Sequence, residues 1–292
     1  MKSKSVMVFF CSIVSIFLFS ACQSDGSGGN VKKANLYDVD REFVKEGVKG
    51  SFLLYDLKAK DYIVDYEPQR NEHSYIPAST FKILNSLIAL EEGVVKNEKQ
   101  VIKWDGKDRG WDKWNRNHDM ESAMKYSAVW FYQVLARKIG AKKMKSWVEK
   151  VKYGNQDISE KIDNFWLEGN LRITPKEQIN FLARLHNNDL PFSQRNMDIV
   201  KKILIIEQND QFTMRAKTGW AQLFEPQIGW WVGYIETGDN AYFFCINIDI
   251  AEEEQAAARM RITRAILSLP GIMDLKNLEK TGTKDEESDR KN

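Results

Sequence analysis

The sequence predicts an α+β protein in which strands from both ends of the chain form one antiparallel sheet beside a mostly helical insertion. Residues 51–66 and 213–250 are rich in β-branched and aromatic residues and are broken by short turns, which is typical of strands. Residues 105–210 between them carry apolar residues at helical spacing. Strands grouped at the two ends around helices favour this layout over alternating strand–helix units.

The composition is that of a globular protein, large enough for one large domain or for two lobes around one cleft. Of the 292 residues, 43% are hydrophobic and 29% are charged, and nine Trp and fifteen Phe suggest a well-filled core. The formal net charge is only +2. A charge this small gives no indication of a nucleic-acid partner.

The first 21 residues predict an export signal. Two lysines precede an almost purely apolar run over residues 6–19, which is too short for a membrane span. The small residues before Cys22 resemble a bacterial lipoprotein cleavage site. We therefore expect removal of a signal peptide at 1–21, lipidation of Cys22, and a periplasmic protein that meets the membrane only through this anchor. Ordinary signal-peptide cleavage beside an incidental Cys is the alternative.

The rest of the chain is expected to divide into three parts. Residues 22–35 are rich in Ser and Gly and predict a flexible tether. Residues 36–275 would form the folded domain, and residues 276–292, with almost no large apolar side chain, should be disordered. Because Cys245 is the one Cys of the domain, no intramolecular disulfide is expected, and its apolar neighbours predict a buried hydrophobe.

Each helix and strand expected in the domain is indicated by a local sequence pattern. Strands at Ser51–Leu57 and Asp61–Tyr66 flank a short Lys-Ala-Lys turn and predict a hairpin. Pro77 precedes apolar residues at helical spacing that end before Gly93, which predicts a helix there. Further along we expect helices at Glu121–Ile139, Thr174–His186 and Glu252–Leu269, and strands at Thr213–Lys217, Ile228–Glu236 and Tyr242–Ile250.

The segment Ser79-Thr80-Phe81-Lys82 starts the helix after Pro77 and could carry nucleophilic chemistry. A spacing of three puts Ser79 and Lys82 on one helix face, so the amine can reach the hydroxyl. A serine is a weak nucleophile without a base beside it. A lysine can be that base only when neutral, and an apolar pocket lowers its pKa by disfavouring the cation. In isolation this motif is weak evidence, because Ser and Lys are common.

Lys217-Thr218-Gly219 strengthens this interpretation. It ends a predicted strand, whose edge can present backbone N–H groups to a carbonyl, and Gly219 lets a ligand approach the backbone closely. Lys217 supplies positive charge for a carboxylate. A strand end with a turn glycine is the alternative for this tripeptide alone. However, S-x-x-K followed by K-T-G near the C-terminal strands is the order that penicilloyl-serine transferases share.

The chain resembles the class D (oxacillinase-type) serine β-lactamases over residues 45–270. Five blocks of that family occur in the family's order: Ser79-Thr80-Phe81-Lys82, Ser127-Ala128-Val129, Tyr153-Gly154-Asn155, Phe165-Trp166-Leu167-Glu168-Gly169 and Lys217-Thr218-Gly219. The third and fourth blocks separate class D from class A, whose Ser-Asp-Asn motif and glutamate base do not occur in the sequence. The resemblance implies a β-lactamase/transpeptidase-like fold and hydrolysis of β-lactam antibiotics through a serine acyl-enzyme.

The resemblance implies catalytic roles for four side chains. Ser79 would be the nucleophile, and Lys82, carboxylated on its amine by carbon dioxide or bicarbonate, would be the general base for acylation and deacylation. The Trp166 indole N–H would hold the carbamate, although most Trp side chains are core aromatics. Ser127 would relay a proton to the β-lactam nitrogen, the alternative being a hydroxyl on a helix face. No metal and no other cofactor is implied.

The resemblance also assigns residues around the substrate. The backbone N–H groups of Ser79 and Trp220 would form the oxyanion hole, typically the largest electrostatic contribution to such reactions. Val129 and Leu167 would cover the carbamate and control the access of water and carbon dioxide. The β-lactam itself would contact Lys217, Thr218, Gly219, Arg259 and Trp111.

The assignment of Arg259 has an alternative, and that of Trp111 affects which substrates are expected. Arg259 belongs to a run of three arginines, so Arg261 could take its place on the substrate carboxylate, and an exposed helix arginine is the non-functional interpretation. Trp111 matches an aromatic residue that arches over the cleft with a Met in carbapenem-hydrolysing relatives, but Gln222 stands where that Met would be. We therefore expect good turnover of penicillins and poor turnover of carbapenems.

Two other functions share these motifs. A penicillin-binding peptidase has the same serine and lysines but lacks a deacylation base, so the block around Trp166 argues against it. A β-lactam sensor domain binds the drug covalently but needs a membrane-spanning signalling partner in its chain. The three His residues, His73, His118 and His186, are scattered and offer neither a zinc pair nor a Ser-His-Asp set. Homodimer formation is left open.

Overall fold

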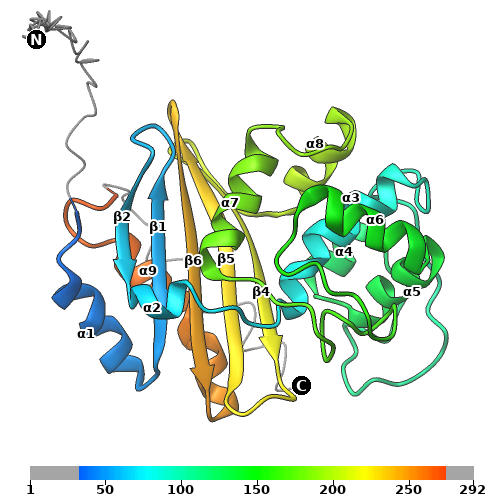
Figure 1. Cartoon of the computed structure of the whole chain (residues 1–292), viewed down its shortest axis with the longest axis horizontal. Helices are drawn as coiled ribbons and strands as arrows, with labels where there is room; N and C mark the ends of the chain where they lie inside the picture. The colour runs from blue at the N-terminus through cyan, green and yellow to red at the C-terminus, as the bar shows by residue number, and fades with distance from the viewer. Residues whose placement is uncertain (1–32, 274–292) are drawn as a thin grey trace, which may run out of the picture. The chain divides into compact units, whose positions relative to one another are not determined.

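The computed structural model describes residues 33–273 (Figure 1). The predicted signal peptide, Cys22, most of the tether and the predicted tail at 276–292 lie outside these residues. The domain limits at 36 and 275 stay a prediction. Among the helices that are described, none is long and apolar enough to cross a membrane.

Strands from both ends of the domain form one antiparallel sheet, as predicted. The described residues contribute six strands in the order β2-β1-β6-β5-β4-β3. Their bounds are β1 Gly50–Asp56, β2 Asp61–Tyr66, β3 Ile205–Gln208, β4 Thr213–Ala221, β5 Gln227–Thr237 and β6 Asn240–Ile250. The N-terminal strand β1 pairs with β6 along its whole length. The predicted hairpin therefore completes the C-terminal sheet, and the α+β layout is confirmed.

The two faces of the sheet pack into two separate hydrophobic clusters. In β6, Phe243 and Cys245 belong to one cluster, whereas Phe244 and Ile246 belong to the other. Successive side chains of a strand point to opposite faces of the sheet. The strands of a sheet that is covered on both faces therefore have continuous runs of apolar residues. Cys245 has no exposed surface, which confirms its predicted burial.

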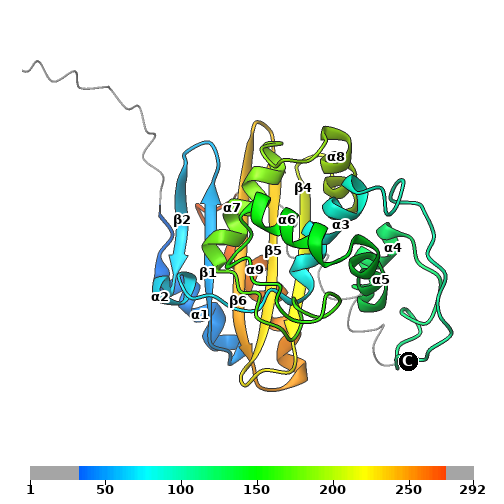
Figure 2. The same ribbon diagram turned by 45° about the vertical axis from the view of Figure 1, so that its right-hand side comes forward.

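Helices cover both faces. On one face, α1 (Leu36–Glu46) and α9 (Ala258–Leu267) pack together and share a core cluster with alternate strand residues. On the other face, α7 (Pro175–His186) lies across β5 and β6 (Figure 2). The other described helices are α2 Pro68–Asn71, η1 Ala78–Phe81, α3 Lys82–Glu91, α4 Met120–Lys125, α5 Val129–Ile139, α6 Ala141–Val151, α8 Gln194–Ile203 and η2 Glu253–Ala257. The predicted helical middle of the chain is thus present.

The prediction of one helix at Glu121–Ile139 is wrong, because α4 and α5 are separated there by a turn. Ser127 in this turn has a φ of 53°, which interrupts the helix. The indole N–H of Trp114 donates to the carbonyl of Tyr126 at 2.8 Å and satisfies an acceptor at the break. Since no Gly or Pro marks the turn, the sequence carries no local signal for it.

The predicted strand at Thr213–Lys217 continues to Ala221, so the Lys-Thr-Gly block lies inside β4 rather than at its end. One edge of β4 pairs with β5 along the whole of β4. On its other edge, β3 pairs only with Thr213–Arg215. The second half of β4 instead lies against η1. The unpaired backbone edge that was expected at the end of this strand is therefore present within β4.

Other elements differ from the prediction in their ends or were not predicted. The helix at Thr174–His186 is confirmed, and Thr174 caps it by accepting the Glu177 N–H at 3.0 Å. The helices expected after Pro77 and from Glu252 each begin with a 3-10 turn, η1 and η2. Helix α1 and strand β3 were not predicted.

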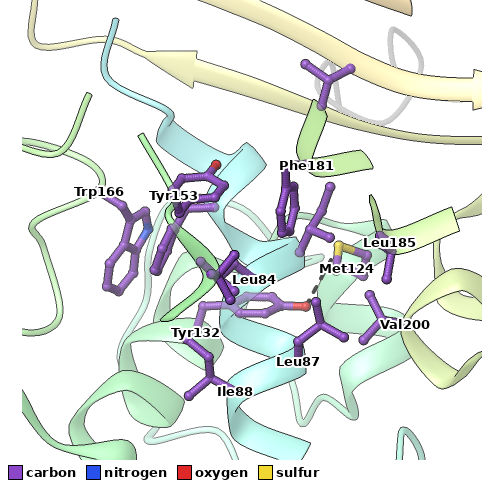
Figure 3. Packing of buried hydrophobic residues seen from close by; sticks show 14 of the residues in the cluster. Leu84, Leu87, Ile88, Met124, Tyr132, Tyr153, Trp166, Phe181, Leu185 and Val200 are labelled. Carbon is purple, nitrogen blue, oxygen red and sulfur yellow. Dashed lines mark hydrogen bonds between the residues drawn. The ribbon is translucent and has the colours of Figure 1, made fainter. Parts of the chain in front are cut away.

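An aromatic cluster links three of the five blocks. The Phe81 ring centroid lies 5.7 Å from that of Tyr153 and 5.0 Å from that of Phe165, and the ring stacks on Trp166 at 5.4 Å. All four side chains are buried. Figure 3 shows Tyr153 and Trp166 within the larger cluster around α3. Burying such a side chain contributes about 1.5–3 kcal/mol, so packing holds these distant segments to η1.

Candidate active site

Ser79 and Lys82 lie together where η1 passes into α3. Ser79 belongs to η1 and Lys82 is the first residue of α3, and Lys82 Nζ lies 2.5 Å from Ser79 Oγ. Ser79 is half-buried, whereas Lys82 has no exposed surface. The structure thus brings together a reachable hydroxyl and a buried amine.

The surroundings of the Lys82 amine disfavour its charge. Burial, reinforced by the nearby Lys217 cation, holds the pKa of Lys82 well below its ordinary value. Its Nζ lies 5.5 Å from the centroid of the buried Tyr132 ring. A neutral amine keeps its lone pair, so it can accept the hydroxyl proton of Ser79.

The turn that presents Ser79 is strained and is held by Thr80. Ala78, directly before Ser79, has a φ of 48°, a conformation that costs a non-glycine residue about 1–2 kcal/mol. The Pro77 carbonyl accepts the Thr80 N–H at 3.2 Å and the Thr80 hydroxyl at 2.8 Å. These two bonds offset the strain and fix the backbone on either side of Ser79.

Strand β4 places the Lys217 side chain on the same face as Lys82. Met214 and Ala216 pack into the cluster that includes α9, so the alternation along the strand directs Lys217 to the opposite face. Lys217 is 5% exposed, and its charge helps to lower the pKa of Lys82. Its Nζ donates to the Thr218 carbonyl at 3.1 Å. The two lysines of the predicted site are thus neighbours.

Gly219 allows β4 to approach the turn that carries Ser79. A Cβ at this position would lie 3.0 Å from the Pro77 carbonyl oxygen and 3.0 Å from Thr80 Cγ2, tighter than side chains normally pack. The missing side chain therefore lets the backbone of Gly219 and Trp220 come close to Ser79.

Ser127 is presented by the turn between α4 and α5. It is half-buried, and its backbone N–H donates to the Met124 carbonyl at 3.2 Å. The Trp111 ring lies 6.4 Å from that of Tyr126, so Trp111 and Ser127 belong to one group of loops. Val129, the first residue of α5, is half-buried on the same turn.

Trp166 lies on the loop that precedes α7. Its ring is fully buried and stacks on Phe81, the residue before Lys82. Its Nε1–H is buried without a hydrogen-bond partner among the described residues. Leaving a buried donor unpaired costs about 1–3 kcal/mol, so this N–H marks a place where an acceptor fits. Leu167, the next residue, is partly buried against the same core cluster.

The Tyr-Gly-Asn block clamps the loop that carries Trp166. Gly154 has a φ of 52°, and a Cβ there would clash with the Arg172 carbonyl oxygen, so only glycine fits. The Asn155 N–H donates to the Arg172 carbonyl at 2.9 Å, and Asn155 Oδ1 accepts the Arg172 N–H at 2.9 Å. The block therefore fixes the end of the loop that carries Trp166.

The two candidate arginines, Arg259 and Arg261, lie in different surroundings. Arg261 pairs with Glu46 at 2.6 Å on the surface formed by α1 and α9. Arg259 lies in the first turn of α9 and is only 3% exposed. Thr218 lies on the α9 face of β4, by the same alternation that directs Lys217 to the other face.

Gln178 was not among the residues predicted from the sequence. It lies on α7 with no exposed surface, and its Nε2 donates to Thr80 Oγ1 at 2.8 Å. A signal was available, because Gln178 falls between apolar residues on the buried face of this helix. A polar side chain on an apolar stripe requires a buried partner.

The arrangement offers a nucleophile, an adjacent base and a cation. Attack of a serine hydroxyl on a carbonyl needs the first two, and Lys217 can attract a carboxylate on the substrate. Among residues 33–273, no group of three or more His, Cys, Asp or Glu side chains is placed to hold a metal ion. The geometry suits acyl transfer through a covalent serine intermediate.

Comparisons with known proteins identify the family. The penicillin binding protein transpeptidase domain family matches residues 50–268. Beta-lactamase OXA-48 of Klebsiella pneumoniae is 48% identical over 205 residues, which cover 70% of this chain and 77% of that protein. Probable beta-lactamase YbxI of Bacillus subtilis (strain 168) is 41% identical over 273 residues, which cover 94% of this chain and 99% of that protein.

Solved structures agree with these relatives. The crystal structure of the class D β-lactamase YbXI from Nostoc has a TM-score of 0.77 and 49% identity and covers 78% of this chain and 96% of its own. FUS-1 (OXA-85), a class D β-lactamase from Fusobacterium nucleatum subsp. polymorphum, has a TM-score of 0.77 and 39% identity and covers 80% of this chain and 97% of its own. The chain therefore belongs to the class D β-lactamases.

Proposed function

We propose that the protein hydrolyses β-lactam antibiotics through an acyl-enzyme on Ser79, with carboxylated Lys82 as the general base of both steps. Hydrolysis of β-lactams as such follows from membership of the class D β-lactamases. The residue-level proposal rests on one observation above all. The Oγ of Ser79 lies 2.5 Å from the Nζ of a lysine that has no exposed surface.

In acylation, the Ser79 hydroxyl would attack the β-lactam carbonyl while its proton passes to the base at Lys82. The carbon–nitrogen bond of the ring breaks, and Ser127 would deliver a proton to the leaving nitrogen. The backbone N–H groups of Ser79 and Trp220 would stabilise the oxyanion, each worth about 3–4 kcal/mol in such sites. The close approach of Gly219 to the turn of Ser79 supports this assignment.

The buried end of Lys82 fits carboxylation of its amine. Carbon dioxide forms a bond only to a neutral amine, which then releases a proton, and the pKa of Lys82 is already lowered. The carboxylated amine would supply an anionic oxygen base beside Ser79. The unpaired Nε1–H of Trp166 would donate to it, which satisfies a donor that is otherwise buried without an acceptor. Val129 and Leu167 would limit the access of water.

Deacylation needs a base that is still unprotonated near neutral pH after Ser79 has become an ester. As a carbamate held by the Trp166 N–H, Lys82 would supply such a base, and its surroundings already keep the free amine neutral for the uptake of carbon dioxide. A water molecule beside Lys82 would then attack the ester carbonyl, and the same backbone N–H groups would stabilise the oxyanion. One base can therefore serve both steps.

The substrate carboxylate would be held from two sides of β4. Lys217 lies on the face of Lys82, and Thr218 lies on the face covered by α9, where Arg259 is buried. Two cations around one anion favour β-lactams that carry a free carboxylate next to the ring nitrogen. Trp111, in the loops beside Ser127, would cover the open side of the substrate.

A chromogenic cephalosporin tests the proposed function directly. The purified protein should turn it over continuously, and Ser79→Ala should lose both hydrolysis and the covalent adduct seen by mass spectrometry. A single stoichiometric burst without turnover would instead indicate a β-lactam sensor or a penicillin-binding peptidase. A surviving adduct in Ser79→Ala would assign the nucleophile to another residue.

The proposed location is the periplasm, with a lipid anchor on Cys22. The proposal is supported by the small residues before Cys22 and by the charged, then apolar, start of the chain. Cys22→Ala should move the protein from the membrane fraction to the soluble fraction of cells. Equal partitioning of the two forms would leave ordinary signal-peptide cleavage as the better explanation.

A further inference from the structure

Gln178 belongs to none of the motif blocks, but it contacts two of them and reaches the third through Thr80. Gln178 Nε2 donates to Thr80 Oγ1 at 2.8 Å, and Thr80 Cγ2 is one of the atoms that Gly219 approaches most closely. The Tyr153 phenol lies beside both polar groups. Burial raises its pKa, and the side chains of Thr80 and Gln178 partly offset this rise. Gln178 on α7 thus connects the Ser-x-x-Lys, Tyr-Gly-Asn and Lys-Thr-Gly segments.

The hydroxyl of Thr80 has its hydrogen-bonding directions fixed. It donates to the Pro77 carbonyl at 2.8 Å and accepts from Gln178. Thr80 is 1% exposed and Gln178 is 0% exposed, so bulk water does not compete for these bonds. A change at Gln178 therefore reaches the Pro77 carbonyl through a single intermediate side chain.

Pro77 and Thr80 form the contact surface between η1 and β4. The ideal Cβ position of Gly219 lies 3.0 Å from an atom of each of them. Ser79 lies between Pro77 and Thr80 in the chain, and its backbone N–H moves with them. The backbone of β4 packs on this surface, so the orientation of Thr80 sets how close the strand comes to the nucleophile.

We propose that Gln178 is a positioning residue for the oxyanion hole. Through Thr80 it fixes the separation between the turn that carries the Ser79 N–H and the strand that carries the Trp220 N–H. This rests on the assignment of the oxyanion hole to those two groups. Oxyanion donors act within about 2.7–3.1 Å of the developing charge, so a small displacement slows the reaction while substrate binding is retained.

Other roles for Gln178 predict different experimental results. If it only stabilised the fold, its loss would lower the melting temperature and leave the chemistry of the folded enzyme unchanged. If it acted on the base, its loss would move the acid limb of the pH–rate profile, because that limb reports the base at Lys82. Positioning of the oxyanion hole lowers the acylation rate constant at every pH and leaves the acid limb in place.

Three variants separate these outcomes in single-turnover acylation by benzylpenicillin. Gln178→Met removes the amide donor at similar length, Thr80→Val removes the hydroxyl at similar shape, and Thr80→Ser keeps the hydroxyl. We expect the acylation rate constant to fall about tenfold in the first two and to fall less in Thr80→Ser, which keeps the hydroxyl but loses the methyl that faces Gly219. The double variant Q178M/T80V should be no slower than Thr80→Val, because both changes remove the same bond.

Asn71→Leu is the matched control. Asn71 on α2 is also fully buried, and its amide donates at 2.8 Å to Asp65 Oδ1 and to the Tyr66 carbonyl. Its substitution should lower the melting temperature and leave the acylation rate constant unchanged. A wild-type rate constant in Gln178→Met, or a shifted acid limb, would overturn the positioning role. Failure of the unaltered enzyme to acylate at all would overturn the proposed function instead.

Discussion

At the scale of single residues, packing alone does not account for Trp166. Its ring fills space against Phe81 and Phe165, which a phenylalanine could also do, but its Nε1–H is buried without an acceptor among the described residues. That donor costs about 1–3 kcal/mol as long as it stays unpaired. An acceptor formed on Lys82 would remove this cost, which is why the indole is informative about the base.

Trp166→Phe should therefore acylate and then stall. Loss of one hydrogen bond to an anionic acceptor removes about 1.5–3 kcal/mol, which corresponds to a roughly 10- to 100-fold slower deacylation. Intact-mass spectrometry during turnover of a penicillin should show accumulated acyl-enzyme. Trp147→Phe is the control, because it loses an indole bond of 2.6 Å to Glu92 at a distance from Ser79. Equal deacylation rates in the unaltered enzyme, Trp166→Phe and Trp147→Phe would contradict the role of Trp166.

At the scale of elements, the loop that carries Trp166 depends on a glycine. Gly154→Ala combines a positive φ with a clash against the Arg172 carbonyl, and we expect it to lower the free energy of unfolding by about 2–4 kcal/mol. Gly93 has a φ of 66° but open space around its Cβ position, so Gly93→Ala should cost only about 1–2 kcal/mol. Urea denaturation of both variants measures their free energies of unfolding. Equal losses would show that the loop carrying Trp166 can shift to accommodate a Cβ at position 154.

The end of α7 carries a pH-dependent contribution to stability. A hydrogen bond from His186 to Glu236 raises the pKa of His186, against the opposing effects of burial and Lys201. Arg215 also pairs with Glu236. Because the folded pKa lies above the ordinary value of about 6.5, this contribution is fully present below that value and is lost as pH rises through the folded pKa.

His186→Gln tests that contribution. Its destabilisation should be largest near pH 5–6 and should shrink as pH rises above the folded pKa. Since His186 is only about half-buried, solvent screening limits the pH-dependent part to about 1 kcal/mol or less. The measurement compares the melting temperatures of the unaltered protein and His186→Gln from pH 5 to above the folded pKa of His186. A difference in melting temperature that is constant with pH would assign the effect to packing.

Elements with strictly local signals could be predicted from the sequence. The hairpin, the strands β4 to β6 and the helix at Thr174–His186 followed from β-branched and aromatic content, turn residues and helical spacing. The break at Ser127 could not be predicted, because its positive φ is supported by the Trp114 indole, a contact between loops. The continuation of β4 beyond Lys217 likewise depends on pairing with β5.

At the scale of the whole molecule, the site forms where the sheet meets the helical insertion. The proposed site would combine η1, the α4–α5 turn, the loop before α7 and the second half of β4, which are far apart in sequence (Figure 1). Motif order identified the segments, because each block keeps its local spacing. The connection through Gln178 could not be found in this way, because its partner Thr80 lies 98 residues away. Such a bond exists only after the chain has folded.

Carboxylation of Lys82 is the central step of the proposed mechanism. The most direct measurement is the steady-state rate at acidic pH with and without bicarbonate, together with carbon-13 NMR of protein exchanged with labelled bicarbonate. As pH falls, protonation of the Lys82 amine should release carbon dioxide. We therefore predict that activity falls in acid and recovers with bicarbonate, alongside a carbamate resonance that is absent in Lys82→Ala. Full activity in carbon dioxide-depleted acidic buffer, with no carbamate resonance, would contradict the account.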